Sequence, residues 1–91
     1  MDMIENMKKM LENGRDDLLL RFGLGQAFLK NEGNEEAIAH LEQAIKHDPK
    51  HSAAWKLLGK AYTANNQSDK AIITYKQGLQ VADEKGDIQA G

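Results

Sequence analysis

Two lysines with helical spacing are the clearest candidates for chemistry. Lys56 and Lys60 are four residues apart in a segment with a helical pattern, so their side chains share one helix face. Two ammonium groups placed in this way can receive a carboxylate or an acidic segment as point charges. Lysines are exposed by default, so two ordinary solvated side chains are the alternative interpretation.

The three histidines do not form a metal-binding pattern. His47 and His51 are four apart, but Asp48-Pro49 lies between them, and proline interrupts the helix that would place them on one face. His40 lies elsewhere, and no further ligand of the usual type converges on the pair. We therefore expect no metal and no cofactor.

No set of residues suggests catalysis. The segment Gly23-Leu24-Gly25 lacks the third glycine of a dinucleotide fingerprint and follows no strand. The acidic pairs Asp16-Asp17 and Glu35-Glu36 begin predicted helices, where the helix dipole explains them. Because no acid, base and nucleophile converge, we expect no catalytic residue and no enzyme activity.

The composition of the chain excludes several classes of protein. The 91 residues are 41% hydrophobic and 29% charged, carry a formal net charge of -2 and include no cysteine. The charge gives no basic footprint for nucleic acid. The apolar runs are too short to span a membrane, and no secretory signal is seen at the N-terminus. We expect a cytoplasmic protein without nucleic-acid or membrane partners.

An internal repeat organises the chain. Sliding the sequence on itself by 34 residues aligns seven identical pairs, most of them small or apolar and spaced as on a helix. The same offset also matches the stripe Met3, Ile4, Met7, Met10 and Leu11 with residues 37–45. The identical pairs are Leu24 and Leu58, Gly25 and Gly59, Ala27 and Ala61, Asn31 and Asn65, Ala37 and Ala71, Ile38 and Ile72, and Gln43 and Gln77.

Helix boundaries follow from local signals. Asn13-Gly14 ends a first helix, and Asp16-Asp17 begins a second that runs to about Lys30. A turn follows, Asn34 is expected to cap a third helix, and Pro49 ends it. Trp55–Ala64 and Ala71–Val81 lie in two more helices separated by Asn65-Asn66-Gln67. The fold class is therefore all-α, with short connections that favour antiparallel neighbours.

A helix pair that recurs every 34 residues resembles the tetratricopeptide repeat (TPR) family. Both repeats keep the Leu-Gly pair of that pattern, and the second keeps its tryptophan. Where the second repeat has Trp55 the first has Arg21, Leu41 replaces the second aromatic residue, Asp83 replaces proline, and Gly78 replaces alanine. The residues that carry the resemblance are Trp55, Leu58, Gly59, Tyr62, Ala71 and Tyr75 in one repeat, and Leu24, Gly25, Phe28, Ala37 and Pro49 in the other.

The resemblance implies one domain of antiparallel helix pairs in a superhelix. Its parts are an N-terminal capping half repeat at 3–13, repeats at 18–51 and 52–85, and a stub of a C-terminal helix at 86–91. Gly25 and Gly59 fall in the middle of helices, where glycine costs about 1 kcal/mol relative to alanine. We expect this cost to be accepted so that another backbone can approach closely.

The resemblance also implies a scaffold that binds a peptide or partner protein in a concave groove. The first helix of each pair would line it. Phe22 is either an apolar anchor in this groove or a core residue packed on the N-terminal helix. Carried over position by position, the lining residues are Leu19, Phe22, Gln26 and Lys30 in one repeat and Ala53, Lys56, Lys60 and Thr63 in the other.

The C-terminal end of this solenoid is incomplete. About three repeats are normally needed for stability, and the helix with Ile72, Tyr75 and Leu79 has no full partner. Two explanations stay open: the chain is a truncated piece, or two chains form a homodimer through this face. The second is an alternative function, a structural self-assembly unit.

Overall fold

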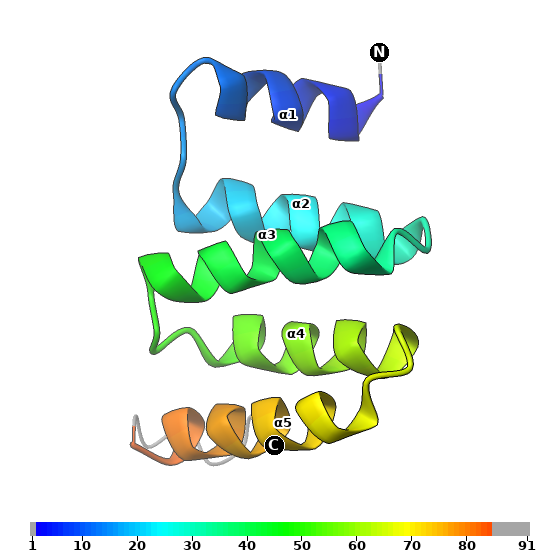
Figure 1. Ribbon diagram of the computed structural model, residues 1–91. Coiled ribbons are helices and arrows are strands. Elements are labelled where there is room, and N and C mark those ends of the chain that lie inside the picture. The colour runs from blue at the N-terminus through cyan, green and yellow to red at the C-terminus, as the bar shows by residue number, and fades with distance from the viewer. Residues whose placement is uncertain (1, 85–91) are drawn as a thin grey trace.

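Five helices make up the structure, a computed structural model that describes residues 2–84 (Figure 1). They are α1 (Met3–Glu12), α2 (Leu18–Lys30), α3 (Asn34–His47), α4 (Ser52–Ala64) and α5 (Ser68–Glu84). These described residues contain no strand, so the all-α prediction is confirmed. The predicted C-terminal stub at 86–91 lies outside them.

Side chains at the helix starts explain where each helix begins. Asp17 caps α2, because its carboxylate accepts a hydrogen bond from the Leu20 amide at 2.8 Å, as predicted. His51 caps α4 through Nδ1, which accepts from the Ala54 amide at 3.1 Å. The prediction that Asn34 caps α3 was wrong. Gly33 precedes that helix, and the Asn34 amide instead donates to the Ala64 carbonyl at 3.1 Å, which joins α3 to the end of α4.

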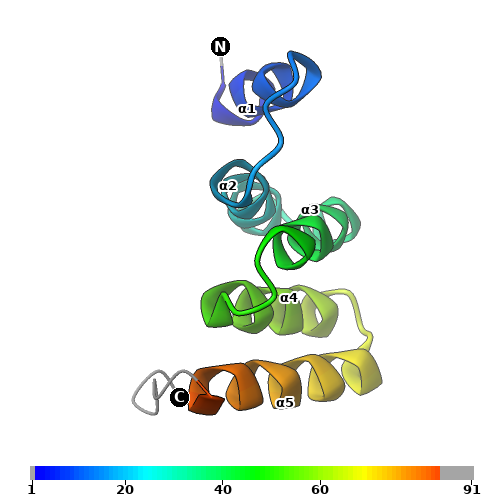
Figure 2. The same cartoon turned by 90° about the vertical axis from the view of Figure 1, so that its left-hand side faces the viewer.

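Consecutive helices pack side by side down the molecule. The closest pairs are α2 with α3 and α4 with α5, while α3 packs on α4 and α1 packs on α2. α2 also contacts α4 directly. The side view shows α2 and α3 displaced to opposite sides of the stack, with α4 running across beneath them (Figure 2). The solenoid therefore has one face formed mainly by α2 and α4 and an opposite face formed by α3.

Small and apolar side chains fill the space between the helices. Leu24 and Leu41 are completely buried, one from each helix of the first pair. Of the alanines that the repeat aligns, Ala37, Ala61 and Ala71 are buried and Ala27 is half-buried, and these small side chains let the helices approach closely. A central cluster runs from α3 through α4 to α5 and consists of Ala37, Leu41, Leu58, Ala61, Tyr62 and Ala71.

The mid-helix glycines receive side chains rather than a backbone, which corrects the expectation from the sequence. A Cβ atom on Gly25 would lie 2.5 Å from Cγ of Leu41, and one on Gly59 would lie 2.7–2.9 Å from the Tyr75 ring. Leu41 and Tyr75 occupy equivalent positions in the two repeats. Each helix pair is therefore closed by one large side chain seated on the glycine of its partner helix.

We predict that Gly25→Ala destabilises the protein. The new methyl group would overlap Leu41, and overpacking of this kind costs about 1–3 kcal/mol, more than the gain in helix propensity of about 1 kcal/mol. Gly23→Ala is the matched control in the same helix, since its Cβ would meet only the Met7 sulfur, at 3.2 Å. Urea unfolding of both variants measures the difference. Equal stability of the two variants would contradict the packing described for Gly25.

Candidate functional site

An apolar hollow lies on the α2–α4 face and reaches α5. Its volume is about 620 Å³, within the range of about 300–1,000 Å³ that ligand sites occupy. Among residues 2–84, two lysines are the only charged residues in its lining. We call it the apolar hollow; it is lined by Phe22, Ala53, Lys56, Leu57, Lys60, Tyr75 and Leu79.

A second hollow continues the first toward α1. Its volume is about 770 Å³, and it shares Leu57 and Lys60 with the apolar hollow, so the two form one groove. Its polar lining includes Gln26, Lys30 and Glu32. We call it the N-terminal hollow; its other lining residues are Met3, Gly23, Ala27, Leu29, Asn34 and Ala64.

The groove brings together most of the side chains carried over from the family pattern. From the predicted set, Phe22, Ala53, Lys56 and Lys60 line the apolar hollow, and Gln26 and Lys30 line the N-terminal hollow with Lys60. Two predicted residues, Leu19 and Thr63, line neither hollow. Leu19 is 72% exposed at the start of α2. The Thr63 hydroxyl donates to the Gly59 carbonyl of its own helix at 3.0 Å.

The lysines of the apolar hollow are available to a ligand. Within residues 2–84 neither Lys56 nor Lys60 takes part in an ion pair or hydrogen bond. Lys60 is exposed and Lys56 is half-buried, and they lie one turn apart on α4. Because the described part of the chain places no carboxylate in the lining, this hollow has a positive rim around an apolar floor.

Phe22 takes part both in the lining of the groove and in the packing of the interior. It is half-buried and packs against the central cluster, and its ring also lines the apolar hollow. The ring meets His51 edge-on, with centroids 5.2 Å apart. The cluster that it packs against consists of residues of α3, α4 and α5. Phe22 is therefore a fixed apolar wall of the hollow.

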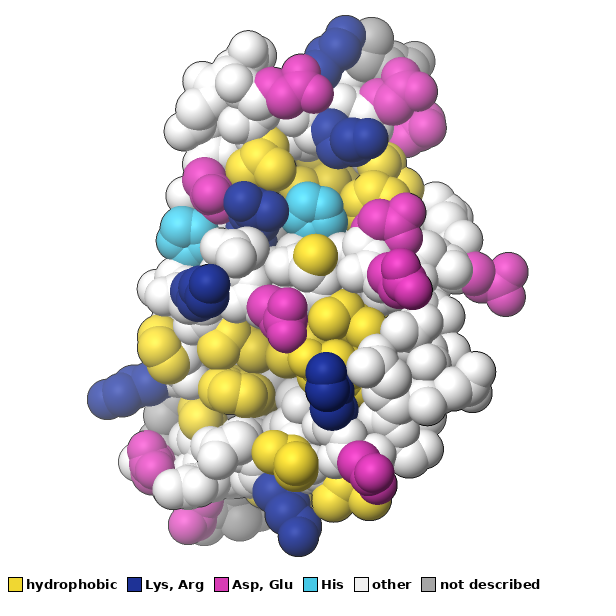
Figure 3. All heavy atoms as spheres, viewed as in Figure 1, with side chains coloured by type: hydrophobic (Ala, Val, Ile, Leu, Met, Phe, Trp, Pro, Cys, Tyr) yellow, Lys and Arg dark blue, Asp and Glu magenta, His cyan; other side chains and the backbone are white. Residues whose placement is uncertain are grey.

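A polar cluster that sequence reasoning missed joins α2 to α3. Arg21 donates two hydrogen bonds to Asp16, at 2.8 and 3.0 Å, and one to Nδ1 of His40 at 3.0 Å. His47 is 2.8 Å from the same carboxylate. Figure 3 views the α3-bearing face, where histidine side chains lie among basic and acidic ones. The only signal in the sequence was that Arg21 stands where the other repeat has Trp55.

This cluster shifts the pKa of its members in defined directions. The hydrogen bonds from Arg21, followed by the contact with His47, hold the pKa of Asp16 well below its usual range. Burial is the largest cause that lowers the pKa of His40, and the positive charges of Arg21 and Lys8 act in the same direction. The His40 ring is also stacked on Phe28, with centroids 5.5 Å apart. The fold therefore favours neutral His40 and ionised Asp16.

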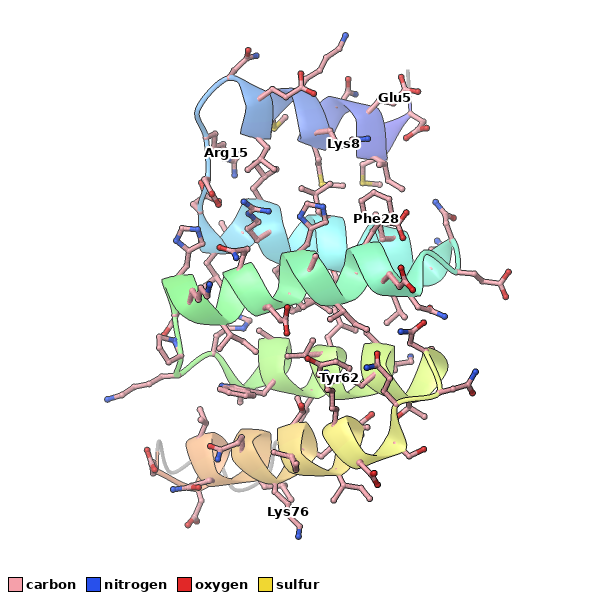
Figure 4. All side chains as sticks on the ribbon, viewed as in Figure 1. Glu5, Lys8, Arg15, Phe28, Tyr62 and Lys76 are labelled. Carbon is pink, nitrogen blue, oxygen red and sulfur yellow. The ribbon has the colours of Figure 1, made fainter. Side chains whose placement is uncertain are left out.

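A tyrosine–carboxylate hydrogen bond joins α3 to α4. The Tyr62 hydroxyl donates to a Glu42 oxygen at 2.8 Å, and Lys70 lies 5.8 Å from the centre of the tyrosine ring. Figure 4 shows Tyr62 on α4. Burial, together with Glu42, raises the pKa of Tyr62 to about 12. This contact fixes the register of α4 on α3.

Metal and membrane chemistry find no support among residues 2–84. No three His, Asp or Glu side chains in this part of the chain gather closely enough to hold a metal ion. None of the five described helices has the length and apolar character needed to cross a bilayer.

The geometry defines a helical-repeat protein with a groove along one face. A family model described as tetratricopeptide repeat matches residues 22–87, and the chain belongs to this family. Proteins of the family generally mediate protein–protein interactions and are generally scaffolds without enzymatic activity.

Similar proteins give the same assignment. A TPR repeat-containing protein of Pseudomonas aeruginosa is 48% identical over 88 residues, which are 97% of this chain and 84% of that protein. The peroxisomal targeting signal 1 receptor of Dictyostelium discoideum is 32% identical over 86% of this chain, but only 12% of the receptor is covered. A solution structure of a Bordetella parapertussis protein matches with a TM-score of 0.83 and 36% identity, over 98% of this chain and 77% of that one.

We predict that acid destabilises the protein in two steps. Since the pKa of His40 is lowered on folding, the unfolded chain binds more protons below pH ~6.5, and stability falls as the pH falls through that region. Asp16 adds stability that is present above its unfolded pKa of about 4 and is lost as the pH falls further.

Urea midpoints measured from pH 8 to pH 3 test this expectation. His40→Gln should reduce the loss between pH 7 and pH 5, and Asp16→Asn should reduce the loss below pH 4. Lys9→Gln, an exposed change on α1 away from the cluster, is the control. A wild-type profile that is flat from pH 7 to pH 5 would rule out the role given to His40.

Proposed function

We propose that this protein is a non-enzymatic scaffold that binds a peptide or partner segment in the groove along α2 and α4. The observation that carries the proposal is the apolar hollow, which has Lys56 and Lys60 on its rim and no carboxylate from residues 2–84 in its lining. An apolar side chain of the ligand would enter the hollow, and a neighbouring carboxylate would meet the lysines.

The relative contributions follow from burial. An exposed lysine–carboxylate pair contributes about 0.2–1 kcal/mol, whereas full burial of one large apolar side chain contributes about 1.5–3 kcal/mol. The hollow therefore supplies affinity, and the lysines select acidic segments and set their orientation. A relative whose name identifies it as the receptor of a targeting signal supports binding of a short segment by this fold.

The wider candidate site follows the continuous groove. Gln26 and Lys30 extend it into the N-terminal hollow, where they offer an amide and a third ammonium group. An extended peptide seated in the apolar hollow would reach them by way of Lys60, which lines both hollows. We place Leu19 and Thr63, the remaining predicted residues, at the margin of the site.

We predict that Lys56→Glu with Lys60→Glu removes the selection for acidic ligands. Peptides would be selected from a random displayed library with the wild-type chain, and their affinities measured by titration calorimetry. We expect enriched peptides to combine one large apolar residue with an acidic one, and the double variant to bind them roughly tenfold more weakly, because two attractive pairs become repulsive.

Lys9→Glu with Lys46→Glu is the matched control, since it makes the same change in net charge at exposed positions outside the groove. Selected peptides should bind this variant as they bind the wild type. The groove assignment fails if both double variants weaken binding equally, or if the selected peptides have no acidic residue.

The exposed face of α5 favours a second candidate function, self-assembly into a homodimer. Ile72 is 54% exposed, Tyr75 38% and Leu79 56%, and the three lie along one stripe. Sedimentation equilibrium between micromolar and millimolar concentrations tests this candidate. A dimer that disappears in Ile72→Glu would support it, and a monomer over the whole range would exclude it.

A further inference from the structure

The outer face of α5 repeats a face that is covered elsewhere in the same molecule. The 34-residue offset matches Ile72, Tyr75 and Leu79 of α5 with Ile38, Leu41 and Ile45 of α3. On α3 these positions are inside, with Leu41 fully buried and both isoleucines half-buried against the central cluster. On α5 the equivalents are 38–56% exposed. The positions that face the partner helix of each pair do not differ in exposure between α3 and α5, since Ala37 and Ala71 are both buried.

What covers the face of α3 shows what fits the face of α5. α4 packs on α3 and places the apolar side chains of Leu58, Ala61 and Tyr62 in the central cluster. Its end is held by the hydrogen bond from Asn34 to the Ala64 carbonyl, and the equivalent of Asn34 on α5 is Ser68. A helix that covered α5 in the same way would end near Ser68 and run antiparallel to α5.

One polar contact distinguishes the two faces. Glu42 on α3 accepts the hydrogen bond from Tyr62, and the residue equivalent to Glu42 on α5 is Lys76. Lys76 is exposed and points away from the stack of helices, whereas Tyr62 lies on α4 within the stack (Figure 4). An ammonium group has donors only, so Lys76 requires an acceptor where α4 offers a donor.

We infer that the outer face of α5 binds an amphipathic helix of another protein that carries small and leucine side chains and, at the position of Tyr62, a glutamate or aspartate. The surface lies at the end of the solenoid. It shares Tyr75 and Leu79 with the lining of the apolar hollow, but Ile72 and Lys76 lie outside that lining, and this inference goes beyond the groove function proposed above. The apolar stripe supplies the contact area, and Lys76 selects the acidic residue.

A second copy of this chain is less suitable as the occupant. Within residues 2–84 the helices of the α4 type already have this face covered, α2 by α1 and α4 by α3. A symmetric contact of α5 with α5, centred between Ile72 and Leu79, would place the two Lys76 side chains near the twofold axis and near each other. Like charges in that position oppose the pairing.

Synthetic helices based on α4 provide the probe. One capped peptide has the sequence of residues 52–64 with glutamate at the Tyr62 position, and its matched control has lysine there. Each would be titrated into the ¹⁵N-labelled chain, with the amide shifts of Ile72 and Lys76, which line neither hollow, as the readout. Isolated helices of this length are marginal in water, so weak binding with fast exchange is expected.

We expect the glutamate peptide to bind at least fivefold more tightly than the lysine peptide, and the order to reverse on Lys76→Glu. Ile72→Glu should abolish binding of both; this position is exposed and lies outside the lining of both hollows, so circular dichroism should show an unchanged fold. Because the groove residues are unchanged in these variants, their result is independent of the peptide selection proposed for the groove.

Three results would overturn the inference. They are the absence of shifts on α5 with either peptide at millimolar concentration, an order of the two peptides that is unchanged by Lys76→Glu, and shifts confined to the groove. A chain that dimerises through α5 in sedimentation equilibrium would also overturn it, because the face would then be occupied by a second copy.

Discussion

The seating of one large side chain on one glycine is the contact on which the rest of the molecule depends. Leu41 occupies the space above Gly25, and Tyr75 occupies that above Gly59. These contacts set the distance between the helices of each pair, and that distance fixes where the next helix packs. The groove exists because α2 and α4 are brought into direct contact in this way, while α3 lies beside α2 and packs on α4 (Figure 2).

Much of the fold could be predicted because the same helix-pair pattern occurs twice in the sequence. Glycine and alanine at matched helical positions, Asp17 at a helix start and Pro49 after a helix end each have a strong local meaning. The turn after α2 shows the limit of such signals. Its left-handed residue is Glu32, not the neighbouring Gly33, and the equivalent in the next repeat is Asn66. The position within the repeat determines that backbone conformation, and the type of residue does not.

The candidate site was harder to predict, because a surface depends on which way each side chain turns. Lys56 and Lys60 could be placed on one face from their spacing. The orientation of the Thr63 side chain could not be predicted, because its hydroxyl can donate either to solvent or to the Gly59 carbonyl. The cluster of Arg21 with Asp16 and His40 was invisible for a related reason: hydrogen bonds over up to 19 residues follow from the packing of α2 on α3.

The exchange of tryptophan for arginine between the repeats has a consequence for how the molecule responds to its surroundings. Trp55 holds the second repeat by packing on Gly78 and by donating to the Pro49 carbonyl at 2.8 Å, contacts that are insensitive to dissolved ions. Arg21 holds the first repeat through a partly exposed ion pair, which salt screens. Within one continuous solenoid, the contact that holds the first repeat therefore responds to ionic strength and acidity, whereas the contacts of Trp55 in the second repeat do not.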